Sequence, residues 1–264
     1  PTAIPDHPLE RPTVIIAEAL VVGLAIGAVL GLIGAGGAVV AVPAFIYLFG
    51  FSAVEATTAS LAVVAVSAAT GALPRLRINQ VRVKQALLFW SLGIVGTFAG
   101  ARLATVIPEL VIVVGFAVVM LGAAVAMWRK SLAKEAGEDV ARAGWLLPVV
   151  AVAIGLLTGI FGVGGGFLVV PALVLVFGFP FAIATGTSLV VVALNSATAL
   201  AFKYDAWSGI SWEIPLFVIV GGVVGSVVAS NLNHGIPQRI LERTFAGLLV
   251  ALAVWMVFEA LVLS

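Results

Sequence analysis

Long apolar runs separated by short polar stretches make up almost the whole chain. Most runs approach the roughly 20 residues that a helix needs to cross a membrane at 1.5 Å per residue. Two runs have only 13 residues, which suits half-helices of a re-entrant hairpin or short tilted crossings. The pattern predicts an all-α polytopic membrane protein with about 8–10 membrane segments. The runs cover 14–33, 38–50, 57–73, 86–103, 109–128, 145–161, 167–179, 184–202, 213–231 and 244–263.

One glycine-broken apolar phrase occurs twice, at 31–37 and at 159–165, and each copy is followed by a proline, Pro43 or Pro171. The offset of 128 residues persists along the chain and becomes 129 in the later runs. A duplicated unit with a helix break at the same place in each copy is typical of transporters whose site lies at the repeat interface. Further matches are Gly27/Gly155, Phe49/Phe177, Gly50/Gly178, Thr57/Thr185, Ser60/Ser188, Gly93/Gly222 and Gly96/Gly225.

A polar stretch at 129–143 divides the chain into a first membrane repeat, 14–128, and a second, 144–263. Lys and Arg are enriched in cytoplasmic loops, which places loops 74–85, 129–143 and 233–243 inside and loop 203–213 outside. Equivalent loops on opposite sides favour inverted repeats, each with a glycine-broken discontinuous helix or hairpin. Parallel repeats remain the alternative and require four crossings in each half.

The composition excludes several classes of protein. With 62% hydrophobic and 9% charged residues, the chain is not a soluble domain. A net charge of +1 without a basic stripe argues against nucleic acid as a partner. The chain has no cysteine, no phosphate-binding loop and no catalytic or zinc signature. We therefore expect no enzyme activity, no metal and no cofactor.

The glycine clusters indicate unwound backbone, because glycine costs about 1 kcal/mol relative to alanine inside a helix. Unwound backbone at membrane depth must be buried in protein or line a wet cavity. The N–H groups at the start of the following half-helix would favour an anion. Close helix packing is the alternative, and it is the expectation for Gly23, Gly27, Gly31, Gly96, Gly100, Gly221 and Gly225. The candidate substrate-binding glycines are Gly36, Gly37, Gly164, Gly165 and Gly166.

Hydroxyl residues open a later apolar run in each repeat. They can donate to an oxyanion without the cost of burying a charge. The alternative is that they cap the helix or bond back to its carbonyls. Asn195 lies two turns beyond Ser188 and matches Ser67 in the first repeat. The candidate polar ligands are Thr57, Thr58, Ser60, Thr185, Thr187, Ser188 and Asn195.

Few charges occur in or beside the apolar runs. Arg75 and Lys203 occupy equivalent positions and, with Arg102, are candidates for charges that concentrate anions at the mouths of a pathway. Topology or lipid anchoring is the alternative. Glu18 and Glu55 are the acids nearest the first candidate site, so coupling to protons is a further interpretation.

The glycine clusters with their following prolines, together with the hydroxyl-rich segments that open the later runs, resemble the TauE/SafE family of sulfite and organosulfur anion exporters. The second repeat matches best, with Gly162-Val-Gly-Gly-Gly166, Val170-Pro171 and Gly186-Thr187-Ser188-Leu189. The first departs at Ala38, where a third glycine is expected, and at Ala59, where Thr is expected. The resemblance implies a multi-pass inner (plasma) membrane exporter of small sulfur-containing oxyanions such as sulfite or sulfoacetate-like sulfonates.

The sequence is compatible with three functions. The first is a secondary transporter for such anions, working by alternating access within membrane lipid. The second is a passive anion channel on the same scaffold, since channels and carriers share the glycine breaks. The third is a membrane scaffold or an intramembrane enzyme, for which the sequence has no catalytic constellation. The anion, the direction of transport, the coupling ion and the oligomeric state are left open by the sequence.

Overall fold

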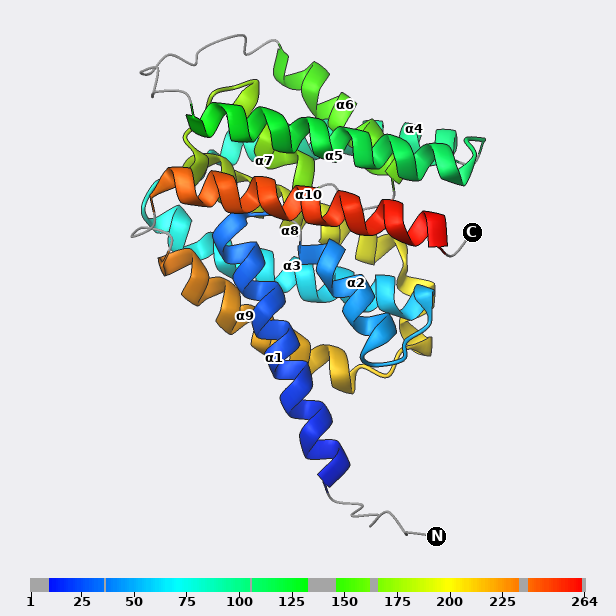
Figure 1. The fold of residues 1–264 in the computed structure, drawn as a ribbon. Helices are drawn as coiled ribbons and strands as arrows, with labels where there is room; N and C mark the ends of the chain where they lie inside the picture. Colours follow the sequence, from blue (N-terminus) through cyan, green and yellow to red (C-terminus); the bar gives the residue numbers. More distant parts are fainter. Residues whose placement is uncertain are drawn as a thin grey trace.

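The computed structural model describes residues 10–262 except 36, 105, 133–145, 162–165 and 233–236. These residues form ten α-helices and a short 3₁₀ helix, η1 (Figure 1). The helices are α1 (Glu10–Ile33), α2 (Gly37–Tyr47), α3 (Ala53–Arg77), α4 (Val83–Ala104), α5 (Glu109–Leu132), α6 (Leu146–Phe161), α7 (Gly166–Leu175), α8 (Phe181–Phe202), η1 (Tyr204–Gly209), α9 (Glu213–Leu232) and α10 (Gln238–Val262).

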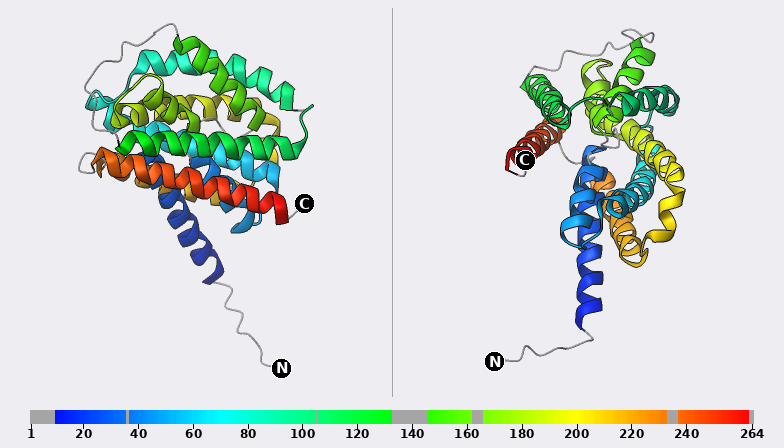
Figure 2. Two further views of the ribbon diagram at one scale, coloured as in Figure 1. Left: turned by 45° about the horizontal axis from the view of Figure 1, so that its top comes forward. Right: turned by 90° about the vertical axis from the view of Figure 1, so that its right-hand side faces the viewer.

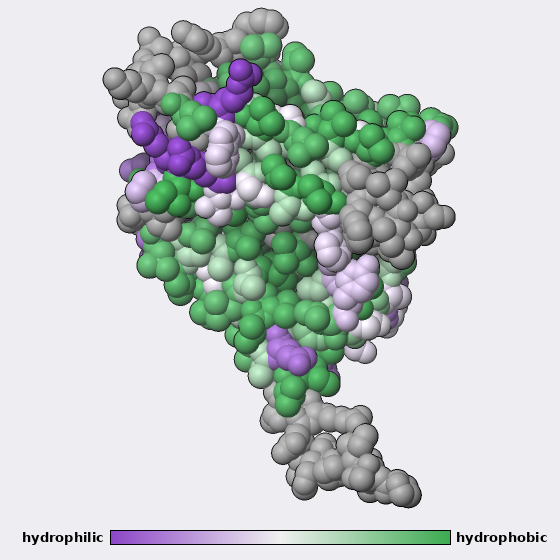
Figure 3. Space-filling model, viewed as in Figure 1, coloured by the Kyte–Doolittle hydropathy of each residue, from purple (hydrophilic) through white to green (hydrophobic). Residues whose placement is uncertain are grey.

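Five of the described helices are long and apolar enough to cross a membrane, and they span Val14–Ile33, Ala53–Arg77, Val83–Ala104, Phe181–Phe202 and Glu213–Leu232. The face in Figure 3 is mostly hydrophobic, with hydrophilic residues gathered at one end of the α5 and α10 helices. Large apolar side chains such as Phe98 and Phe202 are 64% and 77% exposed, as expected for a surface in contact with lipid. The predicted polytopic all-α membrane fold is confirmed.

The two halves use the same chain turn after their short helices. The Phe51 N–H donates to the Phe45 carbonyl at 3.0 Å, and the Phe179 N–H donates to the Leu173 carbonyl at 2.9 Å. Gly50 and Gly178, one residue before each donor, have φ angles of 69° and 62°. Glycine adopts this left-handed conformation without the steric penalty of a side chain. The matched glycines therefore end α2 and α7 in the same way.

Both glycine breaks separate a long helix from a short one. The short helices α2 and α7 have 11 and 10 residues and contain Pro43 and Pro171. At 1.5 Å per residue they extend about 15–17 Å, roughly half of a membrane core. Figure 1 shows α2 turning back from the end of α1. The expectation that the 13-residue runs form short helices is confirmed. The predicted linker begins within α5, which continues to Leu132, and 133–145 lie outside the described residues.

In two closely packed helix pairs, one helix comes from each half of the chain. Helix α9 packs along α1, and α4 packs along α6. In both pairs the backbones touch: a methyl group added at Gly27 would collide with the Gly222 carbonyl, and one at Gly155 would collide with the Gly93 carbonyl. Similar collisions occur at Gly23, Gly31, Gly96, Gly100, Gly159, Gly221 and Gly225. The predicted packing role of the four-residue glycine spacing is confirmed. We call these units the α1/α9 pair and the α4/α6 pair.

Helices α3 and α8, which occupy matching positions in the predicted repeats, run antiparallel. The C-terminal turn of α3 contacts the first turns of α8 through Arg75 and Thr185. At the opposite end Lys203, directly after α8, contacts Thr57 in the first turns of α3. Helices α5 and α10 behave in the same way, since the Arg243 guanidinium near the start of α10 lies 5.6 Å from the Trp128 ring near the end of α5. Figure 2 shows these two helices side by side at the edge of the bundle.

Candidate functional site

Arg75 is a fully buried cation where the two repeats meet. Its Nη1 donates to the Thr185 hydroxyl at 2.5 Å and to the Ala182 carbonyl at 3.3 Å, both in α8. Its Nη2 donates to the Gly31 carbonyl in α1. The side chain is 0% exposed. Arg75 thus joins three helices, and in this conformation it does not lie at an open mouth.

The glycine break explains why an arginine is held here. Helix α1 ends at Ile33, so the Gly31 carbonyl belongs to the last turn and lacks a helical N–H partner. The C-terminal end of a helix carries partial negative charge, which favours a cation. The Ser230 hydroxyl of α9 also donates to this carbonyl, at 3.3 Å. The break therefore places a negative helix end against Arg75.

Lys203 repeats this arrangement in the second half. Its Nζ donates to the Thr57 hydroxyl at 2.9 Å, as Arg75 donates to Thr185. Lys203 is only partly buried, and this burial lowers its pKa below the usual value for lysine. The two cations therefore reach across to equivalent threonines of the opposite repeat, one deeply and one near the surface.

Several of the predicted hydroxyl ligands are engaged by protein. Thr57 and Thr58 donate to the Val54 carbonyl, at 3.0 and 2.7 Å, and Ser60 donates to the Thr57 carbonyl at 2.9 Å. These are the bonds back to the helix that the sequence left as an alternative. In the second repeat, Thr187 accepts the backbone N–H of Arg82 at 3.0 Å.

The remaining predicted residues are more dispersed. Gly37 and Gly166 are the first residues of α2 and α7, while Gly36, Gly164 and Gly165 lie outside the described residues. Ser188 is buried in α8. Arg102 lies at the exposed end of α4, 5.0 Å from the Phe98 ring.

The two acids that the sequence suggested for proton coupling, Glu55 and Glu18, lie in a helix cap and on an exposed helix surface. Glu55 accepts the Ser52 backbone N–H at 2.9 Å, while its own N–H donates to the Ser52 hydroxyl at 3.4 Å. This reciprocal pair caps α3. Glu18 lies on an exposed part of α1.

The junction between α3 and α9 is closed. The Ser226 hydroxyl donates to the Ser67 carbonyl at 2.5 Å and lies 3.5 Å from the Thr70 hydroxyl. A methyl group added at Gly222 would collide with the Ser67 hydroxyl. Ser67 is fully buried. We call this contact the α3/α9 junction.

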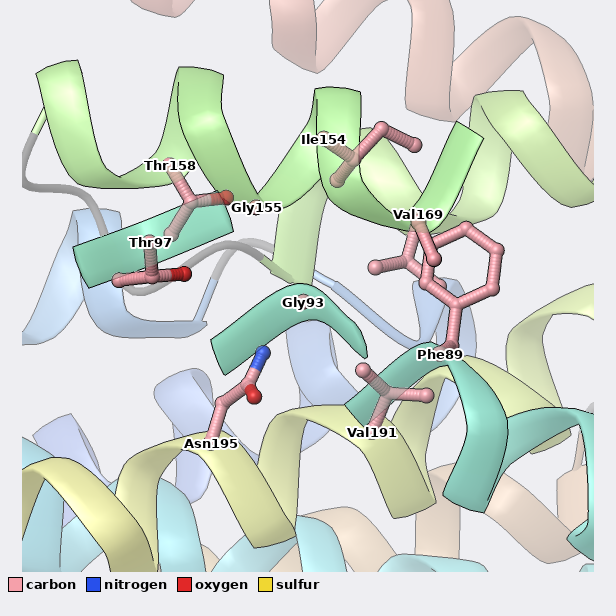
Figure 4. Close-up of a pocket in the computed structure, with 10 residues that line it drawn as sticks. Phe89, Gly93, Thr97, Ile154, Gly155, Thr158, Val169, Val191 and Asn195 are labelled. Carbon is pink, nitrogen blue, oxygen red and sulfur yellow. The ribbon is translucent and has the colours of Figure 1, made fainter. Parts of the chain in front are cut away.

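The repeat-equivalent contact between α4 and α8 is looser and contains a small pocket. Asn195, Gly93 and Thr97 correspond to Ser67, Gly222 and Ser226, and all three line this pocket. Figure 4 shows the Asn195 amide pointing from α8 towards Gly93. A methyl group at Gly93 would have only the Ala151 carbonyl within 4 Å, at 3.8 Å. We call this contact the α4/α8 junction.

Sequence reasoning identified Asn195 but missed Thr97 and Thr158, which line the same pocket from α4 and α6. Thr97 follows the matched glycine Gly93 by one helical turn, and Thr158 directly precedes Gly159, the first residue of the second glycine-broken phrase. Both therefore lie near glycines that occur at matching positions in the two halves of the sequence. The position of Thr97 and Thr158 beside repeated glycines was visible in the sequence. The sequence did not show that α4 and α6 would face α8.

The chain is similar to known membrane transporters. The family described as "Sulfite exporter TauE/SafE" matches residues 19–256. A "Probable membrane transporter protein" of Xylella fastidiosa is 28% identical over 243 residues, covering 89% of this chain and 92% of the relative. The "Probable membrane transporter protein YunE" of Bacillus subtilis is 24% identical, covering 92% and 97%. No solved structure matches the chain.

Proposed function

The chain belongs to the sulfite exporter TauE/SafE family of membrane transporters, and from that premise we propose that it is a secondary transporter for small sulfur-containing oxyanions. Sulfite and sulfoacetate-like sulfonates are the proposed substrates. The proposed direction is export across the inner membrane, by alternating access. Coupling of this transport to protons is part of the proposal.

The observation that carries this proposal is the unequal packing of two equivalent junctions. The α3/α9 junction is closed by the Ser226 hydroxyl, which donates to the Ser67 carbonyl. The α4/α8 junction, built from the matching positions, leaves a pocket at Asn195. A transporter made of two similar halves can alternate by exchanging the conformations of those halves around a central site. One closed and one loose junction is the arrangement expected of a single state in such a cycle.

The glycine contacts define the proposed moving units. Backbone contact along the α1/α9 pair and the α4/α6 pair leaves little freedom within each pair. The weaker contacts lie between the α4/α6 pair and α8. We propose that α4/α6 closes onto α8 while α1/α9 separates from α3. The Ser226 bond to Ser67 and the Arg75 bond to Gly31 break in this step, while the Ser230 bond to Gly31 lies within the α1/α9 pair and is kept.

Arg75 has a role in the same step. An ionisable group in a membrane segment is a functional hypothesis by default. When α1/α9 separates from α3, the contact of Arg75 with the Gly31 carbonyl is lost. The guanidinium would then be available to attract an anion from that side, and Lys203 would act at the other end. The hydroxyls of Thr57, Thr185 and Thr187 and the glycine breaks complete the proposed pathway.

The proposed topology is a first repeat at 14–128, a linker at 129–143 and an inverted second repeat at 144–263. The antiparallel course of α3 and α8, and of α5 and α10, supports inversion. An odd number of crossings in each repeat also reverses the second repeat, whether α2 and α7 cross or form hairpins with the preceding helices.

Counterflow in proteoliposomes tests the function. Unlabelled sulfite inside the vesicles should accelerate uptake of labelled sulfite, and an imposed pH gradient should change the rate if protons are coupled. Trans-acceleration supports a carrier, because only a carrier must return its site across the membrane. Unitary conductance without trans-acceleration would instead support a passive anion channel. If carboxylates accelerate uptake and every sulfur oxyanion fails, the proposed substrate class is wrong.

A further inference from the structure

The pocket at the α4/α8 junction is a small polar space between four helices. Three polar side chains line it: Asn195 from α8, Thr97 from α4 and Thr158 from α6. Phe89, Val169 and Val191 form an apolar wall on one side (Figure 4). The open volume is about 10 Å³, which is close to the room needed for one water molecule.

The donors of this pocket are not used for packing. Within the described part of the chain, the side chains of Asn195, Thr97 and Thr158 make no hydrogen bond to protein. Thr158 is only 8% exposed, whereas Asn195 and Thr97 are partly exposed. A buried polar group without a partner costs roughly 1–3 kcal/mol. Three donors without protein partners around one space, one of them on a buried residue, therefore indicate a place that a polar ligand or water fills.

The α3/α9 junction shows what these positions look like when they are used for packing. There Ser67 replaces Asn195, and Ser226 replaces Thr97 and donates to the Ser67 backbone at 2.5 Å. Leu30 occupies the position of Thr158. The second repeat therefore carries a longer amide and an additional hydroxyl at the looser of the two junctions.

We propose that Asn195, Thr97 and Thr158 bind the transported oxyanion, and that this site prefers singly charged anions. The inference rests on the proposed function and assigns its substrate site. The Asn195 amide supplies two N–H donors and the threonines one O–H donor each. The oxyanion is larger than one water, so binding requires α4 to move away from α8, which their sparse contact permits.

The preference for one charge follows from the absence of charged residues among the ten that line the pocket. Neutral donors can stabilise one negative charge that has left water. Desolvation becomes far more costly for a doubly charged ion, and it is repaid only by a fixed positive charge. The site therefore binds a singly charged sulfonate or hydrogen sulfite in preference to sulfate. Of the proposed substrates, sulfoacetate carries a second charge on its carboxylate and should bind this site weakly.

Titration of the purified protein with methanesulfonate and with sulfate tests this site, because neither probe changes its charge near neutral pH. Methanesulfonate should bind, and sulfate should bind at least tenfold more weakly. Asn195→Leu, which keeps a similar volume without donors, should weaken methanesulfonate binding about tenfold. Thr97→Val and Thr158→Val should each weaken it several-fold. Gly93→Ala adds a methyl group that fits the fold but narrows the pocket, and it should weaken binding too.

Ser91→Ala is the matched control, because Ser91 is an exposed hydroxyl of α4 that bonds back to Leu88. Its affinity should equal that of the unmodified protein. Thermal unfolding of every variant shows that it is folded. Unchanged affinity in folded Asn195→Leu and Gly93→Ala would overturn the site, even if the unmodified protein binds and transports. Equal affinity for sulfate would overturn the charge preference. Absence of binding and transport for every sulfur oxyanion would overturn the proposed function itself.

Discussion

The Arg75 guanidinium of the first repeat donates a 2.5 Å hydrogen bond to the Thr185 hydroxyl of the second. Lys203 and Thr57 make the same contact with the repeats exchanged, at 2.9 Å. Each repeat thus ends its third helix with a cation that reaches the start of the other repeat's third helix. The two contacts differ in depth, since Arg75 is fully buried and Lys203 is partly exposed.

Replacement of Arg75 should destabilise the protein more than replacement of Lys203. Arg75→Ala leaves the Gly31 carbonyl and the Thr185 hydroxyl without their cation, and each bond to a charged donor is worth roughly 1.5–3 kcal/mol. Lys203→Ala removes one contact near the surface, where water replaces it. Thermal unfolding in detergent should show a loss of several degrees for Arg75→Ala and a smaller loss for Lys203→Ala. An equal or larger loss for Lys203→Ala would contradict this account of the two cations.

Helix packing at the shared glycines should tolerate no added methyl group. Gly27→Ala forces a collision with the backbone carbonyl of Gly222, which side-chain movement cannot relieve. We expect little folded protein by fluorescence-detected size-exclusion chromatography. Gly122→Ala in α5 is the control, because nothing lies within 4 Å of the added methyl group. It should be neutral or stabilising by up to about 1 kcal/mol. Normal folding of Gly27→Ala would show that α1 and α9 are not in close contact.

Labelling of single cysteines should report inverted repeats, and the cysteine-free chain makes this test clean. Arg77→Cys and Arg239→Cys should be shielded from an impermeant thiol reagent in intact cells. Ser208→Cys, in the loop equivalent to that of Arg77, should be labelled. All three positions are exposed in the fold, so shielding reports the membrane and not burial in protein. Shielding of Ser208→Cys together with the other two would support parallel repeats instead.

Much of the architecture was predictable because it depends on local sequence. The matched glycines Gly50 and Gly178, the prolines Pro43 and Pro171 and the apolar run lengths determine where helices begin, break and end. The glycine spacing also indicated which helix faces pack closely. It did not indicate their partners. That α1 meets α9, and that α4 meets α6, depends on contacts between helices far apart in the chain.

The candidate site was less predictable for the same reason. Arg75 at a helix end suggested an exposed or lipid-anchored cation, but the break in α1 leaves a carbonyl at Gly31 that holds it inside. The sequence could not show that Thr57, Thr58 and Ser60 bond back to their own helix, as Thr185 also does in the second repeat. Thr97 and Thr158 become candidate ligands only in the folded protein, where α4 and α6 bring them to the same pocket as Asn195 of α8. The sequence showed which hydroxyl side chains lie in the apolar runs, but it did not show their hydrogen-bond partners.

Disulfide trapping of the two junctions tests the central claim of alternating access. A β-carbon added at Gly222 would lie 3.5 Å from that of Ser67, within the roughly 3.5–4.5 Å that a disulfide requires. The repeat-equivalent pair is further apart, since Asn195 has no atom within 4 Å of a β-carbon added at Gly93, where the Ala151 carbonyl at 3.8 Å is the one contact among the described residues beyond the neighbouring α4 backbone. Ser67→Cys/Gly222→Cys should therefore cross-link in the conformation described, and Gly93→Cys/Asn195→Cys only when α4/α6 closes onto α8.

The decisive measurement places all four cysteines in one chain, oxidises it in membranes and identifies the disulfides in each molecule by mass spectrometry. Alternating access predicts both disulfides in the population but never in the same molecule, because closing one junction opens the other. It also predicts that the Ser67→Cys/Gly222→Cys disulfide stops counterflow until it is reduced. Molecules that carry both disulfides, or sustained counterflow with the Ser67→Cys/Gly222→Cys disulfide intact, would contradict the exchange of the two junctions.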